Sequence, residues 1–236
     1  MPEKPNIVLV AGAWADASQW RYVIPPLHEK HYRVFGVQLP LTSLQDDIDR
    51  TSKLIAAQEG PTLLVGHAYG CAVISGAGNA PNVVGLVYLA GPALDEGESL
   101  RTILARHAPP PGFANVHQDQ YGFLWIATDK FRETFCQDLD ETQSLVLALT
   151  QKPTAARCFE DKSGPPAWKQ KPSWYQISTN DRMIPPETEE WMAERIHARK
   201  TITLATSHAS ILSQPDNIVK FVEEAAIALS AKAATP

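Results

Sequence analysis

The stretch Gly66-His67-Ala68-Tyr69-Gly70 has the G-x-S-x-G pattern of a nucleophile elbow, with Ala68 where the pattern has serine. An apolar run at 61–65 predicts a buried strand before it, and the small residues of 71–77 predict a closely packed helix after it. Glycines beside the apex permit the strained, tightly approached backbone of such a turn. We interpret the segment as an elbow without its attacking oxygen, rather than as an ordinary strand-to-helix turn.

Two later loops supply an acid and a histidine, each directly after a predicted strand. Asp181 follows the strand expected at 173–178, and His208 follows the strand expected at 200–204. Taken singly, Asp181 is better explained as a loop or helix-capping carboxylate, and His208 as a surface histidine. Placed behind an elbow, they complete the chain order nucleophile, acid, base, in which histidine takes the nucleophile's proton and the carboxylate orients the histidine.

Further segments extend this pattern along most of the chain: residues 7–14 (IVLVAGAW), 123–125 (FLW), 171–175 (KPSWY), 181–186 (DRMIPP) and 207–208 (SH). With these segments the chain resembles the α/β-hydrolase superfamily, specifically the small esterase-like branch that includes plant methylesterases and hydroxynitrile lyases. Two positions depart from that family. Ala68 replaces the nucleophilic serine, and Ala11 stands where the family usually carries the histidine of a His-Gly pair.

The resemblance implies a Ser-His-Asp mechanism on a small, mainly apolar ester or lactone. The backbone N–H groups of Tyr69 and Ala13 are then the expected oxyanion hole. Because these donors belong to the main chain, alanine at position 68 leaves them in place. The expected site binds a carbonyl compound and forms no acyl-enzyme.

Two explanations of Ala68 remain open at the level of sequence. The alanine is either a substitution that inactivates a hydrolase while preserving binding, or a natural residue. A natural alanine implies a ligand-binding relative, or a cofactor-independent lyase or oxygenase that uses His208 as general base. The codon for position 68 in the natural gene distinguishes these cases. None of them requires a cofactor.

The strand pattern predicts an α/β fold. Strands are expected at 6–10, 32–37, 61–65, 83–89, 173–178 and 200–204, mostly alternating with helical segments. Such alternation predicts a mostly parallel six-stranded sheet with helices on both faces, and the resemblance gives the order 2-1-3-4-5-6. We expect residues 1–94 and 171–236 to form this core, and 95–170 to form an inserted helical cap with helices near 129–138 and 141–150.

Aromatic side chains are the candidates for substrate contact. Trp14 and Tyr69 flank the expected oxyanion hole. The inserted segment contributes four more candidates, which are Tyr121, Phe123, Trp125 and Phe159. An aromatic-lined pocket is typical of small-molecule sites, although each of the four is explained equally well as part of a small core within the cap.

Composition narrows the class of partner. The 236 residues include 21 basic and 26 acidic side chains, a formal charge of −5 without a long run of either sign. This balance argues against nucleic acid or an anionic membrane and leaves a small molecule as the expected partner. Residues 1–4 are polar and the apolar stretch near 82–94 is too short to span a bilayer, which favours a cytoplasmic location. The oligomeric state is undetermined, a homodimer being one option.

Other reactive residues have simpler explanations. Cys71 falls within the first helical turn after the elbow and is expected to face away from the apex, as an inert buried thiol. His67 precedes the apex and is expected to be structural, and Asp95 is a weaker alternative to Asp181. No histidine or cysteine spacing matches a metal site, so no metal is expected.

Overall fold

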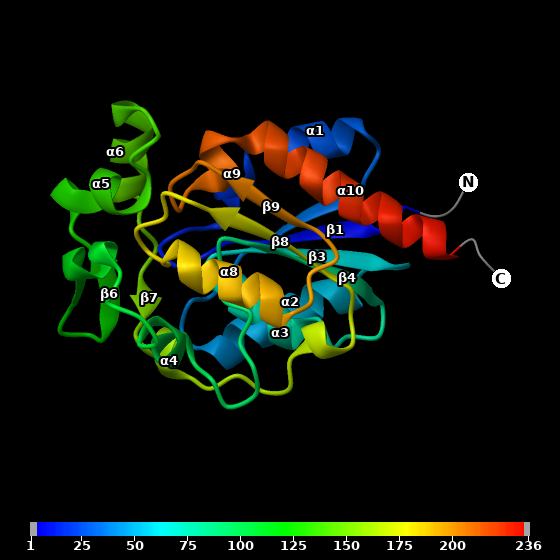
Figure 1. Ribbon diagram of the computed structural model, residues 1–236, viewed down its shortest axis with the longest axis horizontal. Coiled ribbons are helices and arrows are strands. Elements are labelled where there is room, and N and C mark those ends of the chain that lie inside the picture. The colour runs from blue at the N-terminus through cyan, green and yellow to red at the C-terminus, as the bar shows by residue number, and fades with distance from the viewer. Residues whose placement is uncertain (1–3, 234–236) are drawn as a thin grey trace.

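The computed structural model describes residues 4–233, and a six-stranded sheet forms its centre (Figure 1). Every neighbouring pair of these strands is parallel. The order across the sheet is β2 (Val34–Val37), β1 (Asn6–Val10), β3 (Thr62–His67), β4 (Val83–Leu89), β8 (Ser173–Ser178) and β9 (Thr201–Leu204). Counted along the chain, this is the predicted order 2-1-3-4-5-6, and the predicted sheet is confirmed.

Helices cover both faces of the sheet, with α1 and α10 along one side and α2 and α3 along the other (Figure 1). The core helices are η1 (Ala17–Trp20), α1 (Ile24–Glu29), α2 (Leu44–Ala56), α3 (Tyr69–Ala77), α8 (Pro186–Arg195), α9 (Ser210–Ser213) and α10 (Pro215–Ala233). Because both faces are covered, β1 and β3 are buried at every residue and read as apolar runs. The last strand, β9, lies at the edge and alternates between exposed and half-buried residues.

The segment between β4 and β8 contains short helices and a second, antiparallel sheet of order β5-β6-β7. Its elements are α4 (Leu100–Leu104), η2 (Pro111–Asn115), β5 (Val116–Gln118), β6 (Phe123–Ile126), η3 (Thr128–Lys130), α5 (Phe131–Phe135), α6 (Glu141–Leu149), β7 (Thr154–Ala155), α7 (Arg157–Glu160) and η4 (Ala167–Lys169). The helices expected near 129–138 and 141–150 correspond to α5 and α6, whereas the small antiparallel sheet was not predicted. Strands of two to four residues are too short for a readable alternation.

The inserted segment is hydrogen-bonded to the core beside the first strand's loop. The backbone N–H of Trp14 donates to Thr154 Oγ1 at 2.9 Å, and Lys152 donates its N–H to the Trp14 carbonyl at 3.1 Å. Ala155 likewise donates to the Leu41 carbonyl at 2.9 Å. The division of core and cap at residues 94 and 170 stays a prediction.

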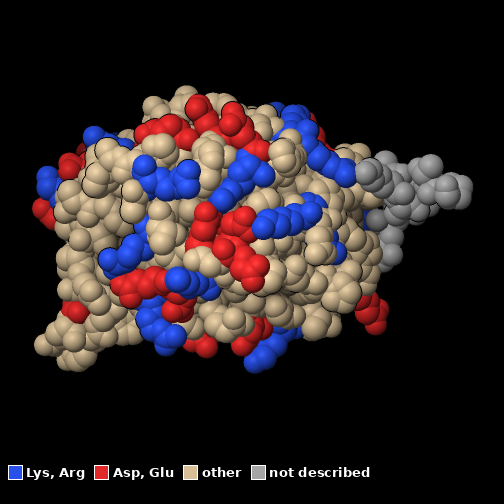
Figure 2. All heavy atoms as spheres, turned by 60° about the horizontal axis from the view of Figure 1, so that its bottom comes forward, with Lys and Arg blue, Asp and Glu red and all other residues tan. Residues whose placement is uncertain are grey.

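On the surface, basic and acidic side chains are interspersed over the face drawn in Figure 2. Mixed charge of this kind supplies no single-sign field that would steer a polyanion. No helix among residues 4–233 is long and apolar enough to cross a membrane.

Close backbone approach fixes the junction of β1, β3 and α3. A Cβ placed on Gly70 would lie 2.3 Å from the Val10 carbonyl oxygen and 2.7 Å from that of Ala11. Both neighbours are main-chain atoms of a central strand and its loop, so neither can move aside as a flexible side chain would. The elbow therefore needs glycine at position 70 for space, independently of its backbone angles.

We expect Gly70→Ala to lower the free energy of unfolding by about 3 kcal/mol or more, because over-packing against backbone forces the strand and helix apart. Urea denaturation measures this change. Gly164→Ala is the matched control, since a Cβ there meets nothing within 4 Å, and it should shift stability by less than about 0.5 kcal/mol. Equal stability of the two variants would contradict the role of this contact.

The inserted segment should open locally more easily than the sheet. Residues 105–109 are exposed and Tyr121 is 77 % exposed, whereas β3 is entirely buried. Hydrogen exchange should therefore show weaker protection over residues 100–125 than over 61–65. Equal protection of the two segments would rule out an independently opening cap.

Candidate active site

Ala68 occupies the apex of a sharp turn between the end of β3 and the start of α3. Its backbone angles are φ 52° and ψ −125°, a conformation that non-glycine residues rarely adopt. Two hydrogen bonds hold it there: its N–H donates to the Leu89 carbonyl at 3.0 Å, and its own carbonyl accepts from the Cys71 N–H at 2.9 Å. The strand, turn and helix predicted for residues 61–77 are therefore present with the geometry of an elbow.

Asp181 and His208 meet at the carboxyl ends of β8 and β9. His208 Nδ1 lies 2.6 Å from Asp181 Oδ2, and both side chains are almost completely buried. The other oxygen, Oδ1, accepts the backbone N–H groups of Met183 at 2.7 Å and Ile184 at 2.9 Å. Because a carboxylate only accepts hydrogen bonds, Nδ1 carries the proton, and in the neutral ring Nε2 is left as the basic nitrogen.

The loop that carries His208 is fixed from three sides. Asp138, from the inserted segment, accepts both the N–H of Ser207 at 2.8 Å and its hydroxyl at 2.5 Å. The Phe135 ring meets the His208 ring edge-on, with centroids 4.8 Å apart. His67 Nε2 lies 2.7 Å from the His208 carbonyl oxygen. Cap and core together therefore set the position of the imidazole.

Ala68 and His208 line one apolar cavity. The remaining lining residues are Ala13, Trp14, Tyr69, Leu100, Leu104, Phe113, Phe159, Met183 and Ile184. The backbone N–H groups of Ala13 and Tyr69 have no acceptor among the described residues. The cavity thus combines an elbow, a buried histidine–carboxylate pair and two main-chain donors.

Phe159 is the centre of the aromatic part of this cavity. Its ring centroid lies 5.6 Å from that of Trp14, 6.3 Å from Tyr69 and 6.1 Å from Phe113. The Trp14 indole N–H donates to the Leu124 carbonyl at 2.8 Å, which fixes the ring against the inserted sheet. Trp14 and Phe159, both predicted for substrate contact, therefore come together.

The other three predicted aromatics do not join them. Tyr121 lies in the turn between β5 and β6 and is 77 % exposed. Phe123 and Trp125 are half-buried on β6, outside the cavity lining, and the Trp125 indole donates to Asp119 at 2.9 Å. Without knowledge of the hairpin, the sequence gives no sign of which aromatics face the core. The aliphatic lining residues were missed, although Met183 and Ile184 lie in the quoted 181–186 segment.

Tyr69 is held by a buried acid that sequence reasoning also missed. Its hydroxyl donates to Asp47 Oδ2 at 2.7 Å, while Asp47 Oδ1 accepts the N–H of Leu41 at 2.8 Å. Burial raises the pKa of Asp47, an effect that these two hydrogen bonds oppose. Asp47 is the fourth residue of α2, and its spacing alone resembles that of any acid in a first helical turn.

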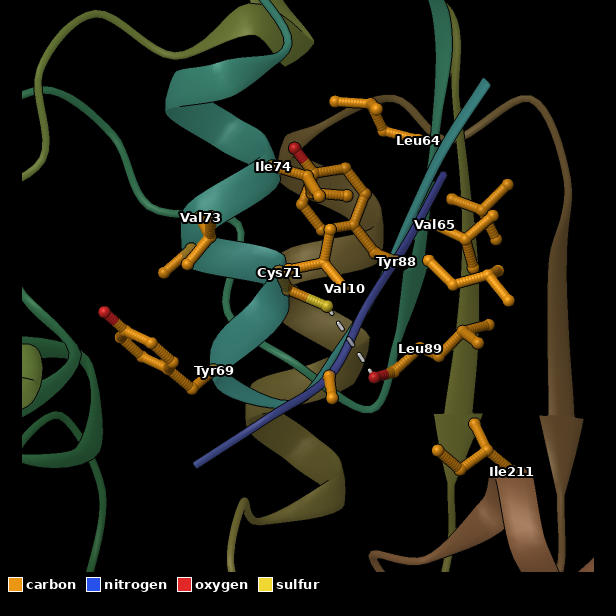
Figure 3. Close-up of a cluster of buried hydrophobic side chains, with 14 of the residues drawn as sticks. Val10, Leu64, Val65, Tyr69, Cys71, Val73, Ile74, Tyr88, Leu89 and Ile211 are labelled. Atoms are coloured by element: carbon orange, nitrogen blue, oxygen red, sulfur yellow. Dashed lines mark hydrogen bonds between the residues drawn. The ribbon is translucent and has the colours of Figure 1, made fainter. Parts of the chain in front are cut away.

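Cys71 and Asp95 take no part in the cavity. Figure 3 shows Cys71 with its Sγ directed toward the Leu89 carbonyl, on the other side of α3 from the Tyr69 ring. Burial raises the pKa of this thiol well above its usual value, so it stays protonated. Asp95 forms an ion pair with Lys169 at the surface. Among residues 4–233, no group of three or more potential ligands could hold a metal ion.

Comparison with known proteins agrees with this geometry. The sequence model of the alpha/beta hydrolase family matches residues 7–221. The alpha/beta hydrolase nvfD of Aspergillus novofumigatus is 24 % identical over an alignment of 246 positions, and the alignment covers 94 % of this chain and 97 % of that protein. A carbendazim hydrolyzing esterase of Nocardioides sp. is 33 % identical over an alignment of 139 positions, which covers 53 % of this chain and 56 % of the esterase.

Solved structures share the fold over nearly the whole chain. A pyrethroid hydrolase from Sphingobium faniae superposes with a TM-score of 0.81 at 20 % identity, covering 95 % of this chain and 98 % of that one. A methylesterase from Arabidopsis gives a TM-score of 0.80 at 15 % identity, with 94 % and 98 % covered. The predicted likeness to a branch that includes plant methylesterases is confirmed at the level of fold.

His67 predicts a pH dependence of stability. Burial lowers the pKa of His67 to about 3, because an imidazolium in this position would lose its hydration. The unfolded chain, with an ordinary histidine pKa near 6.5, then binds more protons than the folded chain below that pH. Stability therefore falls as the pH falls, and this group should account for about 2 kcal/mol of the loss between pH 7 and pH 5.

Urea denaturation of the parent protein and of His67→Gln at both pH values isolates this contribution. Glutamine retains an N–H donor for the His208 carbonyl and does not titrate. The loss of stability between the two pH values should be about 2 kcal/mol smaller in the variant. An identical loss in both proteins would show that His67 is not the proton-linked group.

Proposed function

Because the chain belongs to the alpha/beta hydrolase family, we propose that its apolar cavity is an esterase-type active site with Ala68 at the position of the nucleophile. The substrate class is a small, mainly apolar ester or lactone. In this proposal Asp181 and His208 are the acid and base, and the backbone N–H groups of Ala13 and Tyr69 are the oxyanion hole. The chain binds such a carbonyl compound and forms no acyl-enzyme.

One observation carries the proposal: Ala68, with φ 52°, lines the same cavity as His208, whose Nδ1 is hydrogen-bonded to Asp181. A strained apex facing a buried histidine–carboxylate pair is the arrangement that acyl transfer by a nucleophile needs. The esterase and hydrolase names of the relatives support the same reaction class. Similarity of fold would not by itself support a reaction class, since one fold hosts many functions.

With serine at position 68, the steps follow from the roles of these groups. The Oγ attacks the carbonyl carbon while its proton passes to Nε2 of His208, and the negative oxygen is received by the two backbone N–H groups. The alcohol leaves with the proton from His208, and an acyl-enzyme remains. Water, deprotonated by His208, then attacks the acyl carbon; the bond to the serine Oγ breaks, the Oγ takes the proton back from His208, and the acid is released. Asp181 stabilises the imidazolium in both halves of the reaction.

The cavity wall supports the substrate class. No lysine, arginine, aspartate or glutamate lines it, so a charged substrate would lose its hydration without a counter-charge. Aromatic and aliphatic side chains form most of the lining, as is typical of small-molecule sites. Trp14 and Phe159 are the proposed substrate contacts, with Phe113 and Met183 added to the predicted set.

A second candidate is use of the site without a covalent step. Its support is that the pair of His208 and Asp181 is intact, at 2.6 Å, in a chain that carries alanine at the apex. Such a protein is a ligand-binding relative, or a cofactor-independent lyase or oxygenase with His208 as general base. Turnover by the Ala68 protein that is lost in His208→Ala would favour the base-only enzyme.

We expect Ala68→Ser to hydrolyse a short-chain aryl ester at a rate about 10⁴-fold above that of the Ala68 protein, because serine supplies the missing nucleophile. Stopped-flow absorbance should show a burst of released phenol. The double variant Ala68→Ser, His208→Ala is the control and should lose most of the gain, since serine without a base is a weak nucleophile.

Circular dichroism verifies that both variants are folded. A folded Ala68→Ser protein without burst or turnover across a panel of esters and lactones would overturn the esterase proposal. In that case the non-covalent candidate is the better account of the site.

A further inference from the structure

Glu189 is a buried carboxyl group behind the acid of the site. It lies in the first turn of α8, which packs on β8 (Figure 1), and its exposed fraction is 0 %. One oxygen, Oε2, accepts the backbone N–H of Ser178 at 3.0 Å. The other, Oε1, has no hydrogen-bond partner among the described residues. Burial of an acid with one unsatisfied oxygen calls for a physical explanation.

The groups that face Glu189 offer no compensating positive charge. The Asp181 carboxyl is the charged group that acts on it most strongly and is the side chain with which it can share a hydrogen bond, and the Glu190 carboxyl acts on it from the same helix. From the sheet and from α3, the Tyr175 hydroxyl and the Cys71 thiol are further titratable groups that interact electrostatically with it. All four are neutral or negative, and no lysine or arginine in the described part of the chain pairs with Glu189. Two adjacent carboxylates without water are strongly disfavoured, so one of the pair keeps a proton.

The hydrogen bonds decide which of the two is protonated. Asp181 accepts three N–H groups, from Met183, Ile184 and His208. Glu189 accepts only one. Burial, with the neighbouring Asp181 charge as a second cause, raises the pKa of Glu189 well above its usual value. The start of α8 favours a negative charge, but only as a short-range effect that is small beside complete burial.

We propose that Glu189 is a positioning residue that stays protonated and donates its O–H to the Asp181 carboxylate, as a fourth hydrogen bond that fixes the orientation of Asp181 toward His208. The assignment of Asp181 as the orienting acid rests on the proposed function. Glu189 itself touches neither the cavity nor the reacting atoms, and acts through Asp181. Locking an orienting group by a further hydrogen bond is a common requirement of precise sites.

The proton can be observed directly in the Ala68 protein. Difference infrared spectra in heavy water, for the parent protein against Glu189→Gln, should show the C=O stretch of a protonated carboxyl above pH 7 only in the parent. Glu190→Gln, at an exposed position of the same helix, is the matched control and should leave that band unchanged. Absence of the band, or its persistence in Glu189→Gln, would overturn the proposal.

Linkage gives an independent measure of the same proton. Above about pH 4.5, the usual pKa of glutamate, the unfolded chain loses the proton that the folded chain keeps, so stability falls as the pH rises. Glutamine does not titrate. The ratio of the unfolding constants of the parent and Glu189→Gln should therefore grow about tenfold per pH unit above that point. A ratio that is constant between pH 5 and pH 8 would contradict a protonated Glu189.

The positioning role has its own readout, which does not require catalysis. The downfield proton resonance of His208 Nδ1–H reports its hydrogen bond with Asp181. It should be retained in Glu189→Gln, whose amide still donates, and be shifted or broadened in Glu189→Leu. An unchanged resonance in folded Glu189→Leu would show that Glu189 is only a packing residue. None of these measurements uses an ester. Their outcome is therefore independent of whether Ala68→Ser hydrolyses one.

Discussion

The strained backbone at Ala68 is held by the surrounding main chain, and the geometry of the cavity depends on it. The turn connects a buried central strand to α3, and its φ of 52° persists because the Leu89 carbonyl and the Cys71 N–H are bonded to its peptide groups. Gly70 allows α3 to approach within van der Waals contact of β1, where any Cβ would meet carbonyl oxygens. A strained backbone conformation at one residue is tolerated when the contacts of the neighbouring structure hold that residue in place. Nothing in this arrangement requires a hydroxyl group at the apex.

Hydrogen bonds on the other side of the cavity fix the loop of His208, and among them the pair of His208 and Asp181 is buried whereas Asp138 is exposed. Asp181 fixes His208, while Asp138 fixes the neighbouring Ser207 from the inserted segment. A buried pair such as His208 and Asp181 adds little net stability, because desolvation offsets its attraction, but removing one partner costs about 3–5 kcal/mol. The main effect of these hydrogen bonds is therefore to fix the position and orientation of the His208 imidazole. They also make the orientation of the imidazole depend on docking of the inserted segment, which the sheet alone would not ensure.

In the proposed function, alanine at the apex removes the nucleophile and leaves the groups that bind the substrate in place. The two backbone donors and the apolar wall are properties of the fold, and they are present whichever small side chain stands at position 68. In the proposed function only the nucleophile is a side-chain property, so a single oxygen atom at position 68 is what distinguishes the proposed ester-binding site from one that cleaves the ester. In the role proposed for Glu189, the surroundings likewise decide what a side chain does. An acid at an ordinary helix start becomes a hydrogen-bond donor because it is buried beside a second acid.

The sequence by itself determined the parallel sheet and its strands, the elbow around Ala68, and the pairing of Asp181 with His208. These features rest on apolar runs, glycine positions and chain order, which are local signals. Only the tertiary structure decided that Phe159 faces the cavity while Tyr121 is exposed, that residues 116–126 form a hairpin, and that Asp47 and Glu189 are buried. Each of these depends on contacts between segments tens of residues apart. In the sequence, an acidic or aromatic residue gives the same local signal whether the folded chain buries it or leaves it exposed to water.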